Sequence, residues 1–179
     1  MIHETTIINQ PATIGKNLEA MEYVVIGTDP VKYVRKNLSY KREPPTFGVT
    51  IGNNVTIHGG SQIIKGVEHD TIIGDDVVIG QRNIIGHDCN IGRGAHLLTS
   101  ITLTGHVEIG TRAVLGAGTV VKQRTKIGAG SFIGMGSIVT KDIPPNVVAY
   151  NTCVDGKVYC RPMGEAREGW KNWIRTNLI

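Results

Sequence analysis

Aromatic residues, cysteines and long apolar runs are all scarce in this chain of 179 residues. Two Phe, two Trp and five Tyr are fewer rings than a compact sandwich or helical bundle normally uses to fill its core. Three cysteines are too few for a disulfide scaffold, and no apolar run approaches the roughly 18 residues that a transmembrane helix needs. The sequence therefore predicts a single domain without a membrane span.

Charge is also modest. Charged residues make up 19% of the chain, the net charge is +4 and the pI is near 9.0, which permits an anionic ligand. No Lys/Arg run is interleaved with aromatic residues outside residues 28–50, so we expect no nucleic-acid partner. Residues 1–6 lack the basic and apolar regions of a signal peptide, and with so few cysteines we expect reduced thiols and a cytoplasmic location.

Glycine is abundant, with 23 residues, and it recurs in a six-residue pattern. Stepping by six from Ile73 to Val139 meets Ile, Leu or Val at all twelve positions, and Gly follows eight of them. The same step fits residues 2–26, with Ala20 as one anchor, and residues 51–63, before the register shifts. An ordinary β-sandwich would not give twelve matches in twelve.

A period of six fits neither an α-helix nor simple alternation, but it fits a short strand and a corner, repeated. Three such units would make one triangular coil of eighteen residues, with the aliphatic anchor pointing inward and stacking on the next coil. We expect glycine to relieve corners that need an unusual φ.

Two segments interrupt the rhythm. Residues 28–50 are basic and are predicted to form a loop that projects from the coils. In the tail, Asp155 and Gly156 suggest a hairpin that places Cys153 opposite Val158, so no disulfide to Cys160 is expected. An amphipathic helix should follow from residue 164. We therefore expect a β-helix domain over residues 1–147, with the loop insertion 28–50, and a hairpin and helix over 148–179.

Residues eighteen apart should stack in columns along the edges of the coils. Two adjacent columns carry chemically useful side chains: His69, His87, Gly105, Gln123 and Lys141 in one, and Asp70, Asp88, His106, Arg124 and Asp142 in the other. Histidine beside a carboxylate suits general-base catalysis. The same columns also fit a ladder of alternating charges with no catalytic role. Both interpretations stay open on the columns alone, and Cys89 falls on an inward position typical of a small buried residue.

Longer motifs indicate a family. Residues 85–92 (IGHDCNIG) carry a His-Asp-Cys motif, residues 103–107 (LTGHV) carry a Gly-His-Val motif, and residues 136–145 (GSIVTKDIPP) form a closing motif. Over roughly residues 25–151 the chain resembles the hexapeptide-repeat acyltransferases, in particular the UDP-N-acetylglucosamine acyltransferases of lipid A biosynthesis and bacterial sugar acetyltransferases. The resemblance implies an all-β fold, a left-handed parallel β-helix of hexapeptide repeats. The left hand follows from the resemblance and not from the period.

The resemblance also implies roles for individual residues. His87 would be the general base, the backbone N–H of Gly105 would stabilise the thioester oxygen, and His106 would contact the acceptor. Asp29, in the acceptor loop, or Asp88 would orient His87. The other implied substrate-binding residues are His58, His69, Lys122 and Gln123.

The implied activity is transfer of an acyl group, with acetyl favoured, from a thioester to the amine or hydroxyl of a sugar or nucleotide sugar. Acetyl-CoA or an acyl carrier protein would supply the thioester, with no permanently bound cofactor and no metal. Phe132 and Met135 would border the acyl groove and favour a short chain. A homotrimer with sites in the clefts between chains is expected.

Three alternatives are carried forward. One is a hydroxyacyl-carrier-protein-dependent O-acyltransferase of lipid A synthesis, although two family histidines are replaced here by Ile84 and Lys122. Another is a zinc hydratase of the carbonic-anhydrase type, which would need two histidines five residues apart that this sequence lacks. The last is a non-catalytic β-helical scaffold, which has no need for His87 and Asp88 on an edge.

Overall fold

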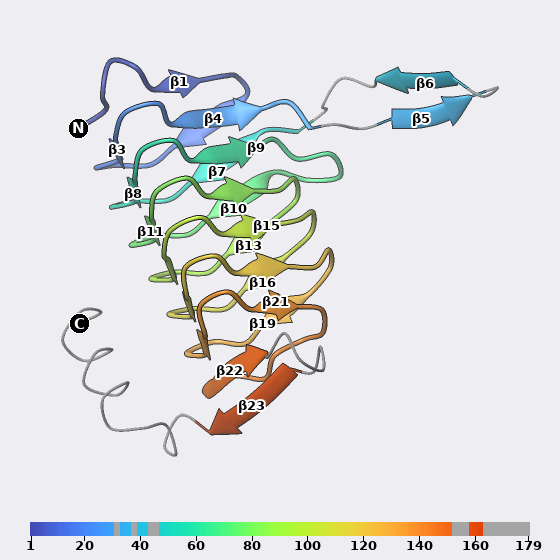
Figure 1. Ribbon diagram of the computed structural model, residues 1–179. Helices are drawn as coiled ribbons and strands as arrows, with labels where there is room; N and C mark the ends of the chain where they lie inside the picture. The colour runs from blue at the N-terminus through green and yellow to red at the C-terminus, as the bar shows by residue number, and fades with distance from the viewer. Residues whose placement is uncertain (31–32, 37–38, 43–46, 152–157, 163–179) are drawn as a thin grey trace.

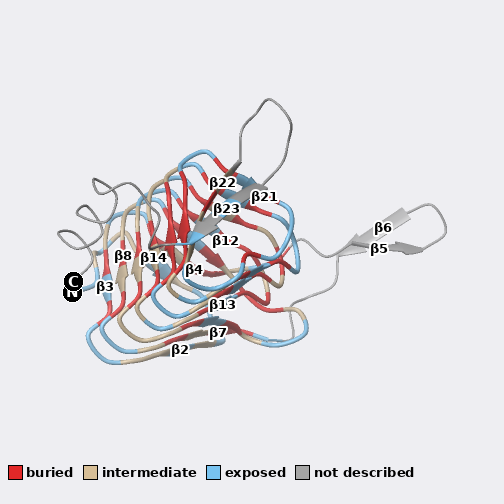
Figure 2. Cartoon of the chain, turned by 90° about the horizontal axis from the view of Figure 1, so that it is seen from below, coloured by how far each residue is buried: buried red, intermediate tan, exposed pale blue. Residues whose placement is uncertain are grey.

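The computed structural model describes residues 1–30, 33–36, 39–42, 47–151 and 158–162. The chain winds through successive coils, each adding a short parallel strand to three sheets (Figure 1). Seen from below, the coils stack into a triangular prism with buried residues inside and exposed residues at the corners (Figure 2). The fold is the predicted left-handed parallel β-helix. Among the described residues, no helix has the length and apolarity to cross a membrane.

The strands fall into three long sheets and one separate hairpin. Sheet 1 consists of β1 (Ile7–Ile8), β4 (Val25–Thr28), β9 (Gln62–Ile64), β12 (Ile84–Ile85), β15 (Thr102–Leu103), β18 (Val120–Val121) and β21 (Ile138–Val139). Sheet 2 consists of β2 (Ala12–Ile14), β7 (Val49–Ile51), β10 (Thr71–Ile73), β13 (Asn90–Ile91), β16 (Glu108–Ile109) and β19 (Lys126–Ile127). Sheet 3 consists of β3 (Glu19–Ala20), β8 (Thr56–Ile57), β11 (Val78–Ile79), β14 (His96–Leu97), β17 (Val114–Leu115), β20 (Phe132–Ile133), β22 (Val147–Asn151) and β23 (Val158–Pro162). The hairpin pairs β5 (Tyr33–Lys36) with β6 (Ser39–Arg42).

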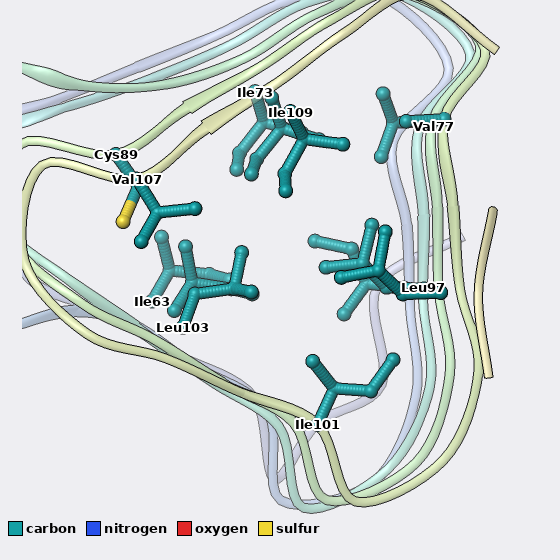
Figure 3. Close-up of a cluster of buried hydrophobic side chains, with 14 of the residues drawn as sticks. Ile63, Ile73, Val77, Cys89, Leu97, Ile101, Leu103, Val107 and Ile109 are labelled. Carbon is teal, nitrogen blue, oxygen red and sulfur yellow. The ribbon is translucent and has the colours of Figure 1, made fainter. Parts of the chain in front are cut away.

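The core is built from the six-residue anchors. All twelve anchors from Ile73 to Val139 are buried, each with at most 3% of its surface exposed. Figure 3 shows how they stack along the axis, with Ile73 in line with Ile109 and Ile63 in line with Leu103. Burying each such side chain contributes about 1.5–3 kcal/mol, so a single coil is weak and the stack supplies the stability.

The eighteen-residue coil is confirmed by the strand register. Ile73 of β10 pairs with Ile91 of β13, which pairs with Ile109 of β16. Besides the coil that carries β5 and β6, one coil is longer, because Gln62 of β9 pairs with Ile84 of β12, 22 residues further on. The four extra residues lie in the connection between β9 and β10, and we call residues 66–70 the corner insertion.

The glycines serve two purposes, of which the sequence predicted one. As expected, some corner glycines have positive φ: Gly60, Gly94, Gly118, Gly130 and Gly136. The eight glycines that follow anchors, such as Gly74 and Gly92, do not have positive φ. A Cβ on Gly74 would instead lie 2.9 Å from the backbone of the next coil, at the N–H of Arg93 and the carbonyl of Ile91. The left-handed position is the second corner residue, which is often not glycine, as at Asp76. Close approach of successive coils therefore explains the repeated glycine.

Two excursions leave the coils. The β5–β6 hairpin lies within the predicted loop and projects from the side of the prism, between β4 and β7 (Figure 1). The tail hairpin β22–β23 is also present, but Asn151 and not Cys153 pairs with Val158, so the predicted register was wrong. Ala149 stands opposite Cys160, whose thiol is free. Cys153 and the predicted helix from residue 164 lie outside the described residues.

Candidate active site

The corners that lead from sheet 1 into sheet 2 gather most of the predicted site residues. We call this column of corners the His87 edge. The N–H of His106 donates to the carbonyl of His87 at 2.9 Å, and the N–H of Arg124 donates to the carbonyl of Gly105 at 3.1 Å. At this edge, backbone hydrogen bonds therefore join each of these coils to the preceding one. The columns expected from the eighteen-residue period are present from His87 and Asp88 onward, whereas His69 and Asp70 lie on the corner insertion and do not continue the turn.

Asp88, His106 and Arg124 share an unusual backbone conformation. Their φ angles are 58°, 59° and 62°, in the left-handed region that Asp and His adopt more readily than most residues. The three residues hold the same turn position in successive coils. This stacking puts Nε2 of His106 3.6 Å from Oδ2 of Asp88.

His87 and Asp88 form a short hydrogen-bonded pair. Nδ1 of His87 lies 2.6 Å from Oδ2 of Asp88. The Asp88 side chain is completely buried, while the His87 side chain keeps 30% of its surface exposed. Such a pair fixes the ring orientation and leaves Nε2 of His87 for chemistry.

Asp88 is ionised in this setting. Burial would raise its pKa, but hydrogen bonds from the N–H of His69, the His87 ring and the N–H groups of Glu68 and Val67 lower the pKa to about 2. The three N–H groups all reach Oδ1, at 2.8–3.0 Å. Oδ2 is thereby left to His87 and His106.

Gly105 lies directly against the His87 ring. A Cβ on Gly105 would stand 2.5 Å from Nε2 of His87 and 3.1 Å from its Nδ1, so any side chain here would displace the ring. Among the described residues, the Gly105 N–H has no backbone acceptor, whereas Thr104 and His106 donate to the neighbouring coils. A donor N–H next to the imidazole is an arrangement that can stabilise a developing oxyanion.

His106 is at the centre of a group of polar side chains. Its ring meets that of His87 edge-on at 5.2 Å and that of His69 at 6.2 Å. Glu68 Oε1 lies 3.9 Å from Nε2 of His106 and 3.9 Å from a guanidinium nitrogen of Arg124. Burial is the largest of several effects on the pKa of His106, which is lowered from its ordinary value, so the site favours the neutral ring.

The sequence did not predict a role for Glu68. The corner insertion carries it, and Asp88 Oδ1 holds the three successive N–H groups of residues 67–69. The ten-residue spacing from Ile63 to Ile73 was the available signal, but spacing alone does not give the path of an insertion. His69 lies on the same insertion, and its ring faces His106, which the predicted columns had not paired with it.

Asp29 also lies at this edge, two coils toward the N-terminus from His87. Its Oδ1 accepts a hydrogen bond from Nζ of Lys65 at 3.0 Å, and the Lys65 side chain is only 8% exposed. The pair lines an open cavity of about 500 Å³, whose walls are Asn9, Gln10, Val25, Thr28, Asp29 and Lys65. Asp88, and not Asp29, therefore forms the hydrogen bond to the His87 ring, and Asp29 lines a separate polar cavity.

The remaining predicted residues are divided between two edges. Lys122 and Gln123 are exposed at the His87 edge, after β18. His58 lies at the edge between sheet 3 and sheet 1, so the chain does not bring it to His87. Of the two side chains expected at an acyl groove, Met135 is 70% exposed, but Phe132 is only 2% exposed.

Cys89 is not a nucleophile in this structure. Its side chain is buried, and Sγ donates to the carbonyl of Thr104 at 3.1 Å. Burial raises the pKa of the thiol to about 12, which keeps it protonated near neutral pH. The inward, structural position predicted from the repeat is confirmed.

A possible metal group overlaps the same residues. Ligand atoms of His69, Asp88 and His106 lie within 4.8 Å of one another, a grouping that histidine spacing in the sequence did not reveal. Tetrahedral zinc would need ligand atoms about 3.3 Å apart. Asp88 Oδ1 already accepts three N–H groups and Oδ2 accepts His87, so the oxygens present fit a hydrogen-bonded network better than a zinc site.

Comparisons with known proteins agree with this architecture. A family model described as the hexapeptide repeat of succinyl-transferase matches residues 82–123, which include His87 and Gly105. The acyl-[acyl-carrier-protein]–UDP-N-acetylglucosamine O-acyltransferase of Burkholderia vietnamiensis is 35% identical over 139 residues, 76% of this chain and 50% of that protein. The chain therefore spans about half the length of the curated relatives it matches.

Solved structures share the fold. The UDP-N-acetylglucosamine acyltransferase of Francisella novicida superposes with a TM-score of 0.74 at 24% identity, covering 100% of this chain and 74% of that one. PerB from Caulobacter crescentus, a perosamine N-acetyltransferase, was solved with CoA and GDP-perosamine. It is 25% identical, with a TM-score of 0.58 over 88% of this chain and 56% of that chain.

Proposed function

Because the chain belongs to the hexapeptide-repeat family, we propose that it is an acyltransferase that moves an acyl group from a thioester to a sugar or nucleotide sugar. The observation that carries the proposal is the 2.6 Å hydrogen bond between His87 and Asp88 at an edge where Gly105 makes room for the ring. A scaffold does not require this arrangement, whereas a general base does.

The hydrogen bond to Asp88 indicates which ring nitrogen of His87 carries the proton. Asp88 is an acceptor only, so Nδ1 of the neutral ring carries the proton and Nε2 carries the lone pair. In the proposed reaction, Nε2 takes a proton from the acceptor nitrogen or oxygen as that atom bonds to the thioester carbonyl carbon. The ionised Asp88 stabilises the imidazolium, which returns the proton to the sulfur when the C–S bond breaks.

Gly105 has the complementary role. The carbonyl oxygen of the thioester becomes negative as the new bond forms, and a backbone N–H stabilises it without reorganisation. The Gly105 N–H has no backbone acceptor among the described residues and lies beside the base. Nucleophile, base and oxyanion donor can therefore meet at the corners of two adjacent coils on the His87 edge.

The acceptor is proposed to lie along the His87 edge. Toward the N-terminus, the cavity with Asp29 and Lys65 offers paired donors and acceptors of the kind that sugar hydroxyls bind. Toward the C-terminus, Lys122, Arg124 and Lys141 are exposed cations suited to phosphates. A nucleotide sugar has both groups. The Burkholderia relative is named for UDP-N-acetylglucosamine, and PerB was solved with GDP-perosamine.

The preferred donor is proposed to be acetyl-CoA. The exposed Met135 would shorten a groove for the acyl chain, and the cations of the later coils would attract an anionic nucleotide. PerB was captured with CoA, which supports this donor. The alternative is a hydroxyacyl carrier protein, the donor class in the name of the Burkholderia relative.

A homotrimer is part of the proposal. The outward column of sheet 1 presents Ile84, Val120 and Ile138, which are 42%, 37% and 55% exposed, in a register continued through Thr102. This apolar face borders the His87 edge, because β12 leads directly into His87. Three chains packed on such faces would bury them and put each edge in a cleft. Light scattering should give about three chain masses at micromolar concentration, and a monomer would contradict the shared cleft.

Thioester consumption tests the function directly. Purified protein is offered acetyl-CoA or hydroxyacyl carrier protein with UDP-N-acetylglucosamine, GDP-perosamine and related amino sugars, and products are weighed by mass spectrometry. Acyl transfer that disappears in His87→Ala supports the proposal. Equal amounts of both donors in one reaction then decide the donor: only long-chain product would favour the carrier-protein alternative. No transfer under any combination would contradict the proposed function.

A further inference from the structure

The corner insertion is built as rigidly as the coils around it. The N–H groups of Gly66 and Thr71 both donate to the carbonyl of Gly48, at 3.0 and 3.1 Å. The Asp70 carboxylate accepts from the Gly48 N–H and from the Thr50 hydroxyl, each at 2.8 Å. Asp88 holds the middle of the insertion through three N–H groups. The insertion therefore has a defined shape and presents its side chains in a defined place.

The shape of the insertion places the Glu68 carboxylate beside the residues of the His87 edge. Glu68 lies in the coil that precedes His87, and its Oε1 reaches His106, two coils further along the chain, and Arg124, three coils further along, at 3.9 Å in each case. The side chain is 61% exposed, so it is open to a ligand. The His106 ring that it reaches lies edge-on to the His87 ring, with centroids 5.2 Å apart.

His69 adds a second acceptor. Its Nδ1 lies 2.8 Å from the carbonyl of Asp70, which can only accept, so Nδ1 carries a proton and Nε2 of the neutral ring carries a lone pair. The ring is 53% exposed and edge-on to His106. In the part of the chain that the structure describes, the two carboxylates beside His106, Glu68 and Asp88, are accompanied by one Arg or Lys side chain, that of Arg124.

An excess of negative charge and lone pairs favours an amine, which binds as an ammonium group, over a hydroxyl. A sugar ammonium group brings a positive charge and three N–H donors, whereas a hydroxyl is neutral and brings one donor. Charge-assisted hydrogen bonds to a carboxylate are about twice as strong as neutral ones. A phosphate at this point would be repelled by Glu68, so the phosphates belong further along the edge.

We propose that the corner insertion makes this site select an amine as the acceptor, with Glu68 as the residue that determines that specificity. The inference rests on the proposed function and chooses between the amine and the hydroxyl that the function leaves open. The ammonium binds beside Glu68 and releases one proton to solvent to become the free amine. The amine nitrogen bonds to the thioester carbonyl carbon, His87 takes its second proton, the C–S bond breaks, and that proton passes to sulfur.

The test uses acceptors that differ in one atom. GDP-perosamine is compared with its counterpart bearing a hydroxyl in place of the amine, and UDP-N-acetylglucosamine with its analogue bearing an amine in place of a ring hydroxyl. The native protein should acylate the amine members with kcat/KM at least about 10-fold higher. Glu68→Gln should lower kcat/KM for amines about 10- to 100-fold and leave the hydroxyl acceptors within about twofold.

Glu108→Gln is the matched control, since Glu108 is an exposed carboxylate on sheet 2, 3.0 Å from Lys126. It should leave both acceptor classes unchanged, and Glu68→Asp should retain part of the preference. Acylation of hydroxyls in preference to amines, or an equal loss for both classes in Glu68→Gln, overturns the inference while the proposed function stands. Absence of transfer to every acceptor overturns the proposed function and the inference with it.

Discussion

Asp76 and Asp88 occupy the same turn position on two different edges of the prism. Both have φ of 58°, and both are the second residue of a corner that follows an aliphatic anchor. Asp76 is partly exposed, bonded to the side chains of Asn54 and Arg93. Asp88 is completely buried and receives three backbone N–H groups and the His87 ring. The local backbone is the same, and the surroundings are entirely different.

The corner insertion causes this difference. On the edge of Asp76 the coil below turns through Asn53 and Asn54 with no extra residue, and the carboxylate meets only exposed side chains. On the His87 edge the insertion folds over Asp88 and removes it from water. A short insertion in a repetitive fold can therefore replace an exposed charge ladder with a buried carboxylate that holds a histidine ring.

Of the changes that test the difference between the two edges, removal of the His87 side chain should have the largest effect on turnover. His87→Ala is expected to lower turnover by about 10²- to 10⁴-fold, the usual contribution of a general base. The fold should survive, because the side chain points outward and is partly exposed. Asp75→Ala changes the equivalent corner position beside Asp76 and should leave turnover unchanged. Near-native turnover in His87→Ala would remove His87 from the mechanism.

Gly105→Ala should have the next largest effect. The added Cβ would stand 2.5 Å from Nε2 of His87 and push the ring out of place, which is expected to cost roughly 100-fold in kcat. The equivalent position on the other edge carries Arg93, so a side chain there is compatible with the corner itself. Gly94→Ala, near only the Arg112 side chain but at φ +65°, controls for backbone strain. Equal kcat losses in both variants would indicate a general structural effect.

Asp88 and Asp76 can be compared through the free energy of unfolding of their Asn variants. Because the pKa of Asp88 is about 2 in the folded chain, below its ordinary value of 3.8, its contribution is present above about pH 4 and is lost as the pH falls toward 2. Asp88→Asn should lower the free energy of unfolding by about 2 kcal/mol at pH 7, and the difference should shrink below pH 4.

Asp76→Asn should change the stability far less. Hydrogen bonds from Asn54 and then Arg93 lower the pKa of Asp76, but solvent screens these exposed contacts. Urea unfolding at pH 7 and at pH 3 measures both variants. A pH-independent loss in Asp88→Asn would show that shape, and not charge, makes Asp88 important.

The smallest effect is expected from chelation. The Asp88 oxygens are committed to N–H groups and His87, so incubation with EDTA should leave transferase activity within about twofold of the untreated protein. Metal analysis of the purified protein is the companion measurement. Activity that is lost on chelation and restored by zinc would identify His69, Asp88 and His106 as a metal site.

The sequence predicted much of the fold and the centre of the candidate site. The six-residue anchors gave the buried stack, and the eighteen-residue columns placed His87, Gly105 and His106 on one edge. These predictions succeed because a repeat fixes each residue's position relative to the next coil. The tail hairpin was expected, but its register was not, since the turn residues Asp155 and Gly156 did not determine the pairing.

The sequence by itself determined which residues point inward, because the six-residue period and backbone sterics act over a few residues. The tertiary structure alone decided that Asp88 is buried and charged, that Glu68 crosses to His106, and that the repeated glycines are needed for close contact between coils. Each of these depends on atoms from a coil 18 or more residues away. The path of the corner insertion follows from hydrogen bonds to Gly48 and Asp88, which no local pattern in the insertion specifies.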